Sequence, residues 1–509
     1  MHTPIVLASA LFLALLAPAW SDALAAEAPP AAPAEASADR IGNSVVQVFS
    51  TRRDPDFVKP WSKQSPHELT GSGVIVEGKR ILTNAHVVTY ASQIQVQANH
   101  AGDKVAASVV AVAPEIDLAL LKLDDESFFD SRPAVGRAGT LPKVKDTVMV
   151  YGFPTGGTSL SITKGIVSRI EFAAYSSSQS GLRIQIDAAI NHGNSGGPAI
   201  ADDKMVGLVF GQLGGAQNIG YIIPCEEIEL FLQDLADGKY DGKPAMFDDL
   251  QTLENPALRA FLKVDKSVQG IVVNLPYGKG SSNPLKKWDL ITRIGDTKID
   301  DQGMVNLGNN LRVRFQYLIQ KLAKNGKVPL TVIRAGKELS LQLPVSTTRP
   351  MVVADLAGKY PSYFIYGPLV FSSASMQFVG AASGWNRGAS GFIGTPVMSR
   401  FLDPPAFDGE EIVVVSSPFL PHKLAVGYSN PAGHVVTAVN HIPIKNLGHL
   451  VQVLRDARDE FITIDFAGHA GEALVFARSE ALAATEEILT DNGIRAQGSP
   501  DTLKVWSAK

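Results

Sequence analysis

A serine lies in the middle of a run of small residues at positions 193–198, where the sequence reads GNSGGP. Such a run lets the backbone turn sharply, which exposes the Ser195 hydroxyl and points successive N–H groups at one place. Acyl transfer needs this arrangement, because an oxygen nucleophile must act beside donors for the oxyanion that develops. The same letters also fit an ordinary glycine-rich turn, so the interpretation depends on whether the chain offers a base and an acid.

Two upstream segments offer that base and that acid. His86 lies in the run TNAHVV, and an imidazole can take the serine proton near neutral pH and pass it to a leaving amine. Asp117 heads the apolar run LALLKL and could hold the imidazole in one tautomer. Taken singly, His86 also fits a core histidine and Asp117 also fits a strand cap. The order His86, Asp117, Ser195 is that of chymotrypsin-like serine proteases, and it favours a catalytic triad.

Other polar residues near the serine receive other roles. We expect the backbone N–H groups of Gly193 and Ser195, together with Asn194, to form the oxyanion hole. His192 lies three residues before the serine, which is too close along a tight loop for its side chain to reach back. Asp187 is a second possible acid, and we interpret it as structural.

A pocket must receive the substrate residue that precedes the scissile bond. We expect Ile190 and the strand that carries Leu208, Val209 and Phe210 to line it. Neither stretch contains an Asp or Glu that would bind a basic side chain. The sequence therefore predicts a preference for small or medium apolar residues.

Length and composition set wider limits. A chain of 509 residues is expected to hold about three domains. The net charge of −4, without a basic run, argues against a nucleic-acid partner. Residues 73–79 approach a phosphate-binding loop, but Arg80 replaces its final Ser or Thr, so we expect no nucleotide. The ten histidines show no paired ligand spacing, so we expect no metal, and no other cofactor is predicted.

The N-terminal segment is typical of exported proteins. Residues 4–20 are almost wholly apolar, and the Ala-Leu-Ala run at 23–25 fits a cleavage site. We interpret residues 1–25 as a signal peptide, with an uncleaved anchor as the alternative, and residues 26–39 as a disordered linker. Cys225 is the only cysteine, which excludes an intramolecular disulfide, and we expect it to be a small buried residue. Export without disulfides favours a Gram-negative periplasm.

The predicted elements form a protease domain and two smaller modules. Residues 40–240 alternate short β-branched runs with turn residues, which predicts a mainly β fold of two barrels closed by a helix at 226–237. Long loops are expected at 51–70 and 171–182. Mixed α/β modules are expected at 245–349 and 350–509. Predicted strands lie at 45–49, 73–76, 94–97, 105–112, 118–123, 147–151, 183–186, 205–210, 270–275, 290–294, 330–334, 411–415 and 461–466, and further helices at 256–262, 312–322 and 447–456.

The motifs around His86, Asp117 and Ser195 closely resemble those of the Deg/HtrA family of S1-type serine proteases, and further stretches agree. Within the protease domain these are GSGVIV at 71–76, YGFP at 151–154, GIVSRI at 165–170 and GYIIP at 220–224. KWDLI at 287–291, with IGD at 294–296, is similar to HtrA-type PDZ domains. PSYFI at 361–365 and DEF at 459–461 are similar to the second, divergent PDZ-like module of the plant-organelle Deg subgroup.

This resemblance implies a chymotrypsin-like double β-barrel protease domain followed by two mixed α/β PDZ-like domains. It implies an ATP-independent serine endopeptidase that cleaves unfolded or damaged proteins and assembles as a homotrimer or a multiple of trimers. It places a regulatory loop at 51–70 and an activation-sensing loop at 171–182. The alternative is a chaperone-like or binding protein whose protease domain these loops hold inactive.

One stretch departs from the family pattern. The first PDZ domain usually opens with a glycine-containing loop whose amides bind a C-terminal carboxylate. The matching residues 244–249 contain no glycine and include Asp248 and Asp249, which would repel a carboxylate. Both modules could instead serve assembly or regulation.

Overall fold

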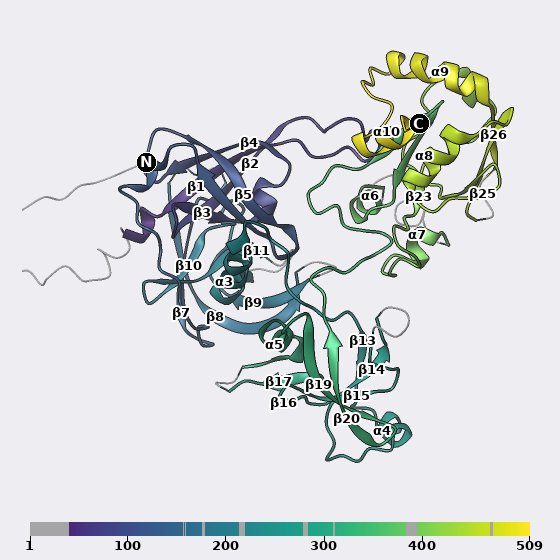
Figure 1. The fold of residues 1–509 in the computed structure, drawn as a ribbon. Helices are drawn as coiled ribbons and strands as arrows, with labels where there is room; N and C mark the ends of the chain where they lie inside the picture. The colour runs from purple at the N-terminus through teal and green to yellow at the C-terminus, as the bar shows by residue number, and fades with distance from the viewer. Residues whose placement is uncertain are drawn as a thin grey trace, which may run out of the picture.

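The computed structural model describes residues 40–508 except 156, 158, 176–178, 213–218, 278–282, 309–310, 383–393 and 469–471. A pair of β-barrels, coloured purple to blue-green in Figure 1, is followed by a green module and a yellow-green module. We call residues 245–349 the first C-terminal module and residues 350–508 the second. The predicted signal peptide and linker lie outside the described residues.

The first part of the chain forms two closed barrels, with strand orders β1-β2-β3-β6-β5-β4 and β10-β11-β12-β9-β8-β7. The predicted mainly β, double-barrel fold is confirmed. The first barrel contains β1 (Val45–Arg52), β2 (His67–Val76), β3 (Arg80–Thr83), β4 (Ala91–Ala98), β5 (Val105–Ala113) and β6 (Leu118–Leu123). The second contains β7 (Thr147–Gly152), β8 (Ser161–Ala174), β9 (Ser180–Ile186), β10 (Pro198–Ala201), β11 (Lys204–Gln212) and β12 (Gly220–Pro224).

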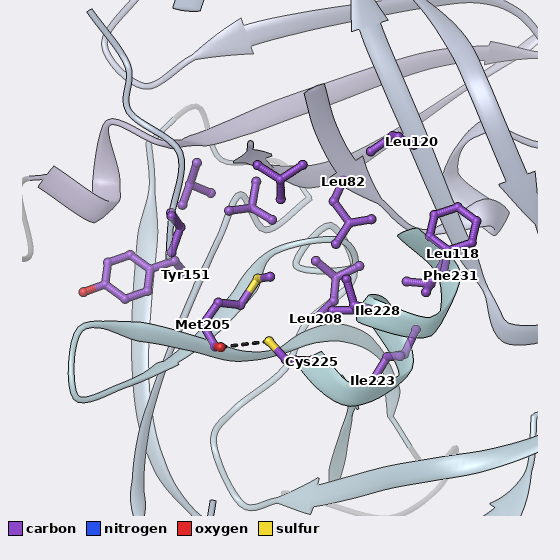
Figure 2. Packing of buried hydrophobic residues seen from close by; sticks show 14 of the residues in the cluster. Leu82, Leu118, Leu120, Tyr151, Met205, Leu208, Ile223, Cys225, Ile228 and Phe231 are labelled. Atoms are coloured by element: carbon purple, nitrogen blue, oxygen red, sulfur yellow. Dashed lines mark hydrogen bonds between the residues drawn. The ribbon is translucent and has the colours of Figure 1, made fainter. Parts of the chain in front are cut away.

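A shared hydrophobic cluster joins the two barrels to the helix α3 (Cys225–Asp234), as Figure 2 shows. Leu82 and Leu118 come from the first barrel, whereas Met205 and Leu208 come from the second. Cys225 is buried in this cluster, and its thiol donates a hydrogen bond to the Met205 carbonyl oxygen at 2.8 Å. The junction between the barrels is therefore a packed core, which fixes the position of one barrel against the other.

Both long loops predicted in the protease domain are shorter than expected, because strand pairing continues into them. β1 and β2 pair as far as Arg52 and His67, so the connection is residues 53–66. β8 and β9 pair as far as Ala174 and Ser180, so the second connection is residues 175–179. Within the second connection, residues 176–178 lie outside the described part.

The first C-terminal module is built on a sheet with the order β13-β14-β15-β19-β20, with β16 paired to β15. The predicted helix at 312–322 begins instead as strand β18, because Arg-Val-Arg alternates and buries only Val313. The elements are β13 (Asp249–Thr252), α4 (Pro256–Leu262), β14 (Ile271–Leu275), β15 (Leu290–Ile294), β16 (Thr297–Lys298), β17 (Met304–Asn306), β18 (Arg312–Arg314), η4 (Phe315–Leu318), α5 (Ile319–Leu322), β19 (Lys327–Arg334) and β20 (Lys337–Pro344).

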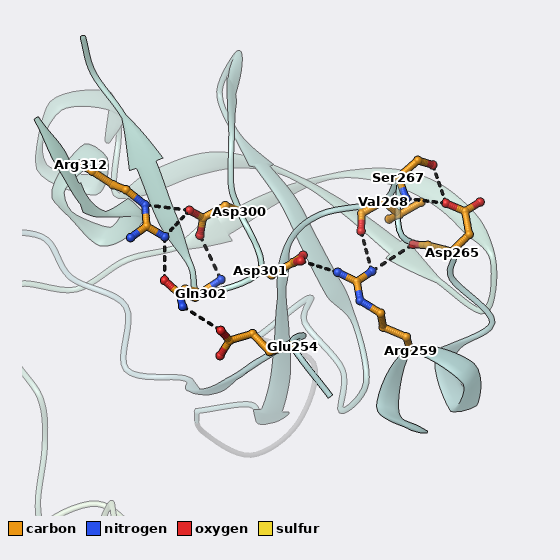
Figure 3. A network of polar contacts seen from close by, with 9 residues as sticks. All are labelled: Glu254, Arg259, Asp265, Ser267, Val268, Asp300, Asp301, Gln302 and Arg312. Carbon is orange, nitrogen blue, oxygen red and sulfur yellow. Dashed lines mark hydrogen bonds and ion pairs between the residues drawn. The ribbon is translucent and has the colours of Figure 1, made fainter. Parts of the chain in front are cut away.

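A polar network joins the edges of this module (Figure 3). Arg259 on α4 forms an ion pair with Asp301, and Arg312 on β18 forms an ion pair with the neighbouring Asp300 at 2.6 Å. Gln302 links the Arg312 guanidinium to Glu254. The helix α4 and the β17–β18 hairpin are thus tied to the same turn.

The second C-terminal module holds two sheets, ordered β21-β22-β23 and β25-β24-β26-β27. Among the described residues, no helix is both long enough and apolar enough to cross a membrane. The strands are β21 (Tyr363–Tyr366), β22 (Leu369–Ser373), β23 (Val413–Val415), β24 (Val436–Val439), β25 (Ile442–Pro443), β26 (Phe461–Phe466) and β27 (Leu474–Ala477). The helices are α6 (Met376–Ala382), α7 (Pro396–Ser399), α8 (Leu447–Asp456), α9 (Arg478–Asp491) and α10 (Pro500–Trp506).

Residues 53–66 of the protease domain contact this second module. Phe57 packs against a hydrophobic cluster that includes Val352 and Val353. Trp61 packs against a second cluster, with its ring centroid 6.4 Å from that of Tyr363. This connection, which the sequence predicted to be a long loop, therefore contributes two large apolar side chains to an interface within the chain.

Candidate active site

His86 and Asp117 lie together at the end of the first barrel. His86 is on α2 (Ala85–Val88), a single helical turn after β3, and Asp117 directly precedes β6, which pairs with β3. The His86 Nδ1 atom lies 2.8 Å from Asp117 Oδ2. The His86 backbone N–H also donates to Asp117 Oδ1 at 2.9 Å. Pairing of these two strands thus brings together the base and the acid that the sequence predicted.

The surroundings of Asp117 hold its carboxylate toward the imidazole. Its φ angle is 56°, a left-handed conformation in which Asp is more frequent than most other side chains. Asn84 Nδ2 donates to the Asp117 carbonyl oxygen at 2.9 Å. Because a carboxylate only accepts hydrogen bonds, its contact with Nδ1 favours the tautomer in which Nε2 can accept a proton. The His86 side chain is 44% exposed and that of Asp117 only 19%, so the imidazole is accessible to a substrate.

The turn that carries Ser195 is anchored by Ser72, a residue of the first barrel. The Ser72 N–H donates to the Ser195 carbonyl oxygen at 2.7 Å. The Ser72 hydroxyl donates to the Gly193 carbonyl oxygen at 2.8 Å and accepts from the Phe153 N–H at 2.8 Å. Gly196 has a φ of 86°, and a Cβ there would overlap the Ser72 carbonyl oxygen, so only glycine fits. The candidate nucleophile is therefore fixed to the barrel that bears His86.

Two backbone amides of this turn remain available for an oxyanion. In the described part of the chain, neither the Gly193 N–H nor the Ser195 N–H donates a hydrogen bond. The Asn194 N–H, which the sequence also placed in the oxyanion hole, donates to the Asn191 carbonyl oxygen at 3.1 Å. The structure contradicts the prediction that Asn194 contributes to the oxyanion hole. Its N–H is already bonded within the turn and cannot donate to a substrate oxygen.

The Ser195 hydroxyl is not yet joined to the imidazole. Across the described residues it forms no hydrogen bond, either with His86 or with another group. Catalytic hydrogen bonds are often long in the absence of substrate and tighten when substrate binds. The structure thus contains the His86–Asp117 pair and the serine turn, but no hydrogen bond joins the Ser195 hydroxyl to the His86 imidazole.

The structure contradicts two of the four residues predicted for the specificity pocket, and Ile190 and Phe210 stay a prediction. Leu208 and Val209 are fully buried and belong to two separate core clusters, so neither side chain can meet a substrate. Their assignment to the pocket is wrong, because this barrel strand is covered on both faces. Ile190 is 8% exposed, and a Cβ at Gly220 would overlap its side chain. Phe210 is partly buried between the rings of Tyr175 and Tyr221, with centroids 5.2 and 6.2 Å away.

The other polar residues near the serine have separate places. Asp187 Oδ1 accepts the Ile166 N–H at 2.6 Å, a strand contact that agrees with its structural interpretation. The His192 carbonyl oxygen accepts the Thr155 N–H at 2.7 Å. No group of three or more His, Cys, Asp or Glu side chains is arranged for a metal ion within the described ranges.

Two protein-family models match parts of this chain. The family model for a trypsin-like peptidase domain matches residues 71–208, and that for a PDZ domain matches residues 352–501. Protease Do-like 2, chloroplastic, from Arabidopsis thaliana is 34% identical over 91% of this chain and 76% of its own length. The chain belongs to the Do-like (Deg/HtrA) family of serine proteases. Protease Do-like 4, mitochondrial, from the same plant is 33% identical over 87% of this chain and 83% of its own length.

Solved structures of other proteases are similar to part of this Do-like protease. The HtrA-type protease AlgW with a decapeptide is 25% identical, with a TM-score of 0.47, and covers 62% of this chain and 98% of its own. A serine endoprotease from Yersinia pestis is 21% identical, with a TM-score of 0.43, and covers 64% of this chain and all of its own.

Sequence reasoning missed several residues that support the site of this Do-like protease. Ser72 anchors the serine turn, Asn84 holds the Asp117 backbone, and Arg52 Nη1 donates to the His86 carbonyl oxygen at 3.1 Å. Ser72 stood inside the family stretch GSGVIV, which was the available signal. Asn84 stood inside the quoted run TNAHVV, whereas nothing in the sequence pointed to Arg52, because its partner His86 lies 34 residues away.

Proposed function

We propose that this protein is an exported, ATP-independent serine endopeptidase in which His86, Asp117 and Ser195 form the catalytic triad. The single observation that carries the proposal is the bidentate hold of Asp117 on His86, through both the imidazole Nδ1 and the backbone N–H. An ordinary surface ion pair would not need the backbone contact, whereas a general base must be kept in one orientation.

The chemistry follows from these positions. His86 Nε2 takes the proton from Ser195 Oγ as the oxygen attacks the scissile carbonyl. The Gly193 and Ser195 N–H groups stabilise the oxyanion, and Asp117 stabilises the imidazolium. The imidazolium then gives its proton to the leaving amine, which breaks the peptide bond and leaves an acyl-enzyme. Water, deprotonated by His86, hydrolyses that ester and regenerates Ser195, so no step requires a nucleotide.

Substrate, assembly and compartment belong to the same proposal. Unfolded or damaged proteins are the substrate class that family membership suggests, and a trimer or multiple of trimers is the assembly. The N-terminal apolar segment supports export to a periplasm. Protease Do-like 2 and protease Do-like 4 are named chloroplastic and mitochondrial, so the proposed periplasmic location rests on the N-terminal segment.

One observation favours a second candidate function. The Ser195 hydroxyl lacks a hydrogen bond to His86 within the described part of the chain. A chaperone-like or binding protein whose protease domain is mostly inactive would have this feature in its resting state. The two candidates differ in whether the wild-type protein turns over a substrate.

Cleavage of unfolded casein by the wild type and by Ser195→Ala distinguishes them. We expect Ser195→Ala and His86→Ala each to lower kcat by a factor of about 10⁶, and Asp117→Asn to lower it by somewhat less. A serine-directed fluorophosphonate is expected to label Ser195 in the wild type. Equal casein cleavage by purified Ser195→Ala would show that the nucleophile is another residue, and no cleavage by either would favour the chaperone-like function.

A further inference from the structure

A buried ion pair lies where the chain leaves the protease domain. Lys243 Nζ lies 2.6 Å from Glu227 Oε2, and the two side chains are only 6% and 1% exposed. Glu227 is on α3, whereas Lys243 is in the segment that leads into the first C-terminal module. In Figure 1, α3 lies over the barrels near β11, and β9 lies on the side of α3 that faces the first C-terminal module. The triad does not use this pair, so its burial needs another explanation.

Both charged groups bind the backbone at the start of β9, on the same side of the strand. Lys243 Nζ donates to the Ser180 carbonyl oxygen at 3.0 Å, and the Leu182 N–H donates to Glu227 Oε1 at 2.7 Å. Between them, a Cβ at Gly181 would lie 2.7 Å from Lys243 Nζ and 2.9 Å from Glu227 Oε1, closer than real Cβ contacts. Each charge is therefore paired and also bonded to the backbone of this strand, which a buried ion pair needs if it is to persist.

From this strand, direct contacts lead to the serine turn. The Tyr175 hydroxyl donates to the Leu182 carbonyl oxygen, and the partly buried Tyr175 ring packs on Phe210 with centroids 5.2 Å apart. Next to Phe210, the Val209 carbonyl oxygen accepts the Gly196 N–H at 2.8 Å. The Val209 N–H donates to the Gly197 carbonyl oxygen at 2.9 Å. Gly196 and Gly197, which follow Ser195, are thus bonded to β11, the strand whose Phe210 contacts Tyr175.

We propose that Lys243 and Glu227 are positioning residues for Ser195, acting through the start of β9, Tyr175 and the Phe210 strand. This inference rests on the proposed nucleophilic role of Ser195. The pair also connects catalysis to the linker, because Ala245 pairs with Ser346 and Gln179 Nε2 donates to the Thr347 carbonyl oxygen at 3.1 Å. A displacement of the first C-terminal module would therefore move Lys243 first and the strands of the barrel afterwards.

The test compares Lys243→Met, Glu227→Gln and the double variant with the wild type, in the full-length protein. Lys239→Met is the matched control, because Lys239 lies in the same linker and pairs with Asp241 but is 76% exposed. The rate of fluorophosphonate labelling of Ser195 reports on the nucleophile without a bound substrate. Hydrogen exchange of the Gly196 and Gly197 amides reports on the turn whether or not the protein is active.

We expect Lys243→Met to label about tenfold more slowly and to lower kcat more than it raises KM. The Gly196 amide should exchange faster, whereas Lys239→Met should match the wild type in all readouts. The double variant should recover part of the loss, because it removes the buried carboxylate that Lys243→Met leaves unpaired. Lys243→Arg, which keeps the charge, should retain most of the labelling rate.

Other outcomes separate this inference from the proposed function. Wild-type labelling and wild-type Gly196 exchange in folded Lys243→Met would overturn the positioning role while leaving the triad intact. Failure of the wild type itself to label would overturn the function, and the exchange data would still decide whether the pair holds the turn. Should Lys243→Met fail to fold, Glu227→Gln carries the same comparison, because its amide oxygen can still accept the Leu182 N–H.

Discussion

Tyr360 of the second C-terminal module packs its ring against Tyr90, four residues after His86, with centroids 5.3 Å apart. The Tyr90 hydroxyl donates to the Lys359 carbonyl oxygen at 3.1 Å, and the Tyr360 hydroxyl donates to the Arg53 carbonyl oxygen at 2.9 Å. Tyr90 has a φ of 61°, which is costly for an aromatic residue and persists only where its surroundings hold it. The second module therefore braces the segment that carries the candidate base.

Replacing Tyr360 by alanine should weaken that support. An aromatic pair contributes about 0.5–1.5 kcal/mol beyond its area, so we expect kcat to fall by roughly twofold to tenfold. Casein cleavage at saturating substrate measures the change. Phe407→Ala removes another exposed aromatic residue of the same module and should leave kcat unchanged. Wild-type kcat in Tyr360→Ala would show that this contact does not reach His86.

Cleavage sites should follow the apolar character of the pocket that remains after Leu208 and Val209 are excluded. Ile190 and Phe210 offer no charge to a basic side chain, so we expect Val, Ala or Leu before the scissile bond. Exchanging such a residue for Lys in a peptide substrate should lower kcat/KM by about tenfold or more. A survey of casein fragments by mass spectrometry dominated by cleavage after Arg and Lys would contradict this specificity.

A cavity of about 620 Å³ lies between the protease domain and the first C-terminal module, lined in part by residues 171–174 and 244–249. Asp248 Oδ1 accepts the Tyr277 N–H at 2.9 Å, and burial raises the pKa of Asp248.

We expect a peptide with a free apolar C-terminus to bind the full-length protein no better than its C-terminal amide. Calorimetry with the matched pair measures this. A preference for the acid of more than about tenfold, or 1.4 kcal/mol, would show carboxylate recognition despite the aspartates.

The thiol of Cys225 should be unreactive while the protein is folded. Burial raises its pKa from 9.0 to about 12, so the nucleophilic thiolate is scarce in the folded state at pH 8. An unfolded thiol ionises at lower pH, so this group lowers the free energy of unfolding progressively as pH rises above about 9. Iodoacetamide should modify Cys225 only after urea unfolds the chain. Rapid modification of the native protein would mean that the barrel junction opens readily.

The sequence predicted the elements that local patterns define. The strand Leu118–Leu123 and the helices Pro256–Leu262 and Leu447–Asp456 have the predicted bounds, because each has a clear apolar period and a polar or proline start. The turn α2 was missed because four residues are too few to show a helical period. A single sequence therefore reveals segments with a regular apolar period, whereas it does not reveal short turns that tertiary contacts fix.

The candidate site divides in a similar way. Residue types and chain order gave His86, Asp117 and Ser195, because that chemistry limits the choice of side chains. Leu208 and Val209 were misplaced because the whole strand was assigned to the pocket, whereas its successive side chains point into two core clusters on opposite faces. The Glu227–Lys243 pair could not be foreseen, since two charges 16 residues apart carry no sign that they will be buried together.

The anchoring of the Ser195 turn by Ser72 has a consequence for biosynthesis. Ser72 belongs to the first barrel and the turn to the second, so a chain still emerging from the ribosome cannot complete the site when only its first half has folded. Peptide-bond cleavage becomes possible only after the strands up to β12 have closed the second barrel around the turn. The candidate site is therefore a property of the complete pair of barrels, and neither barrel can hold it alone.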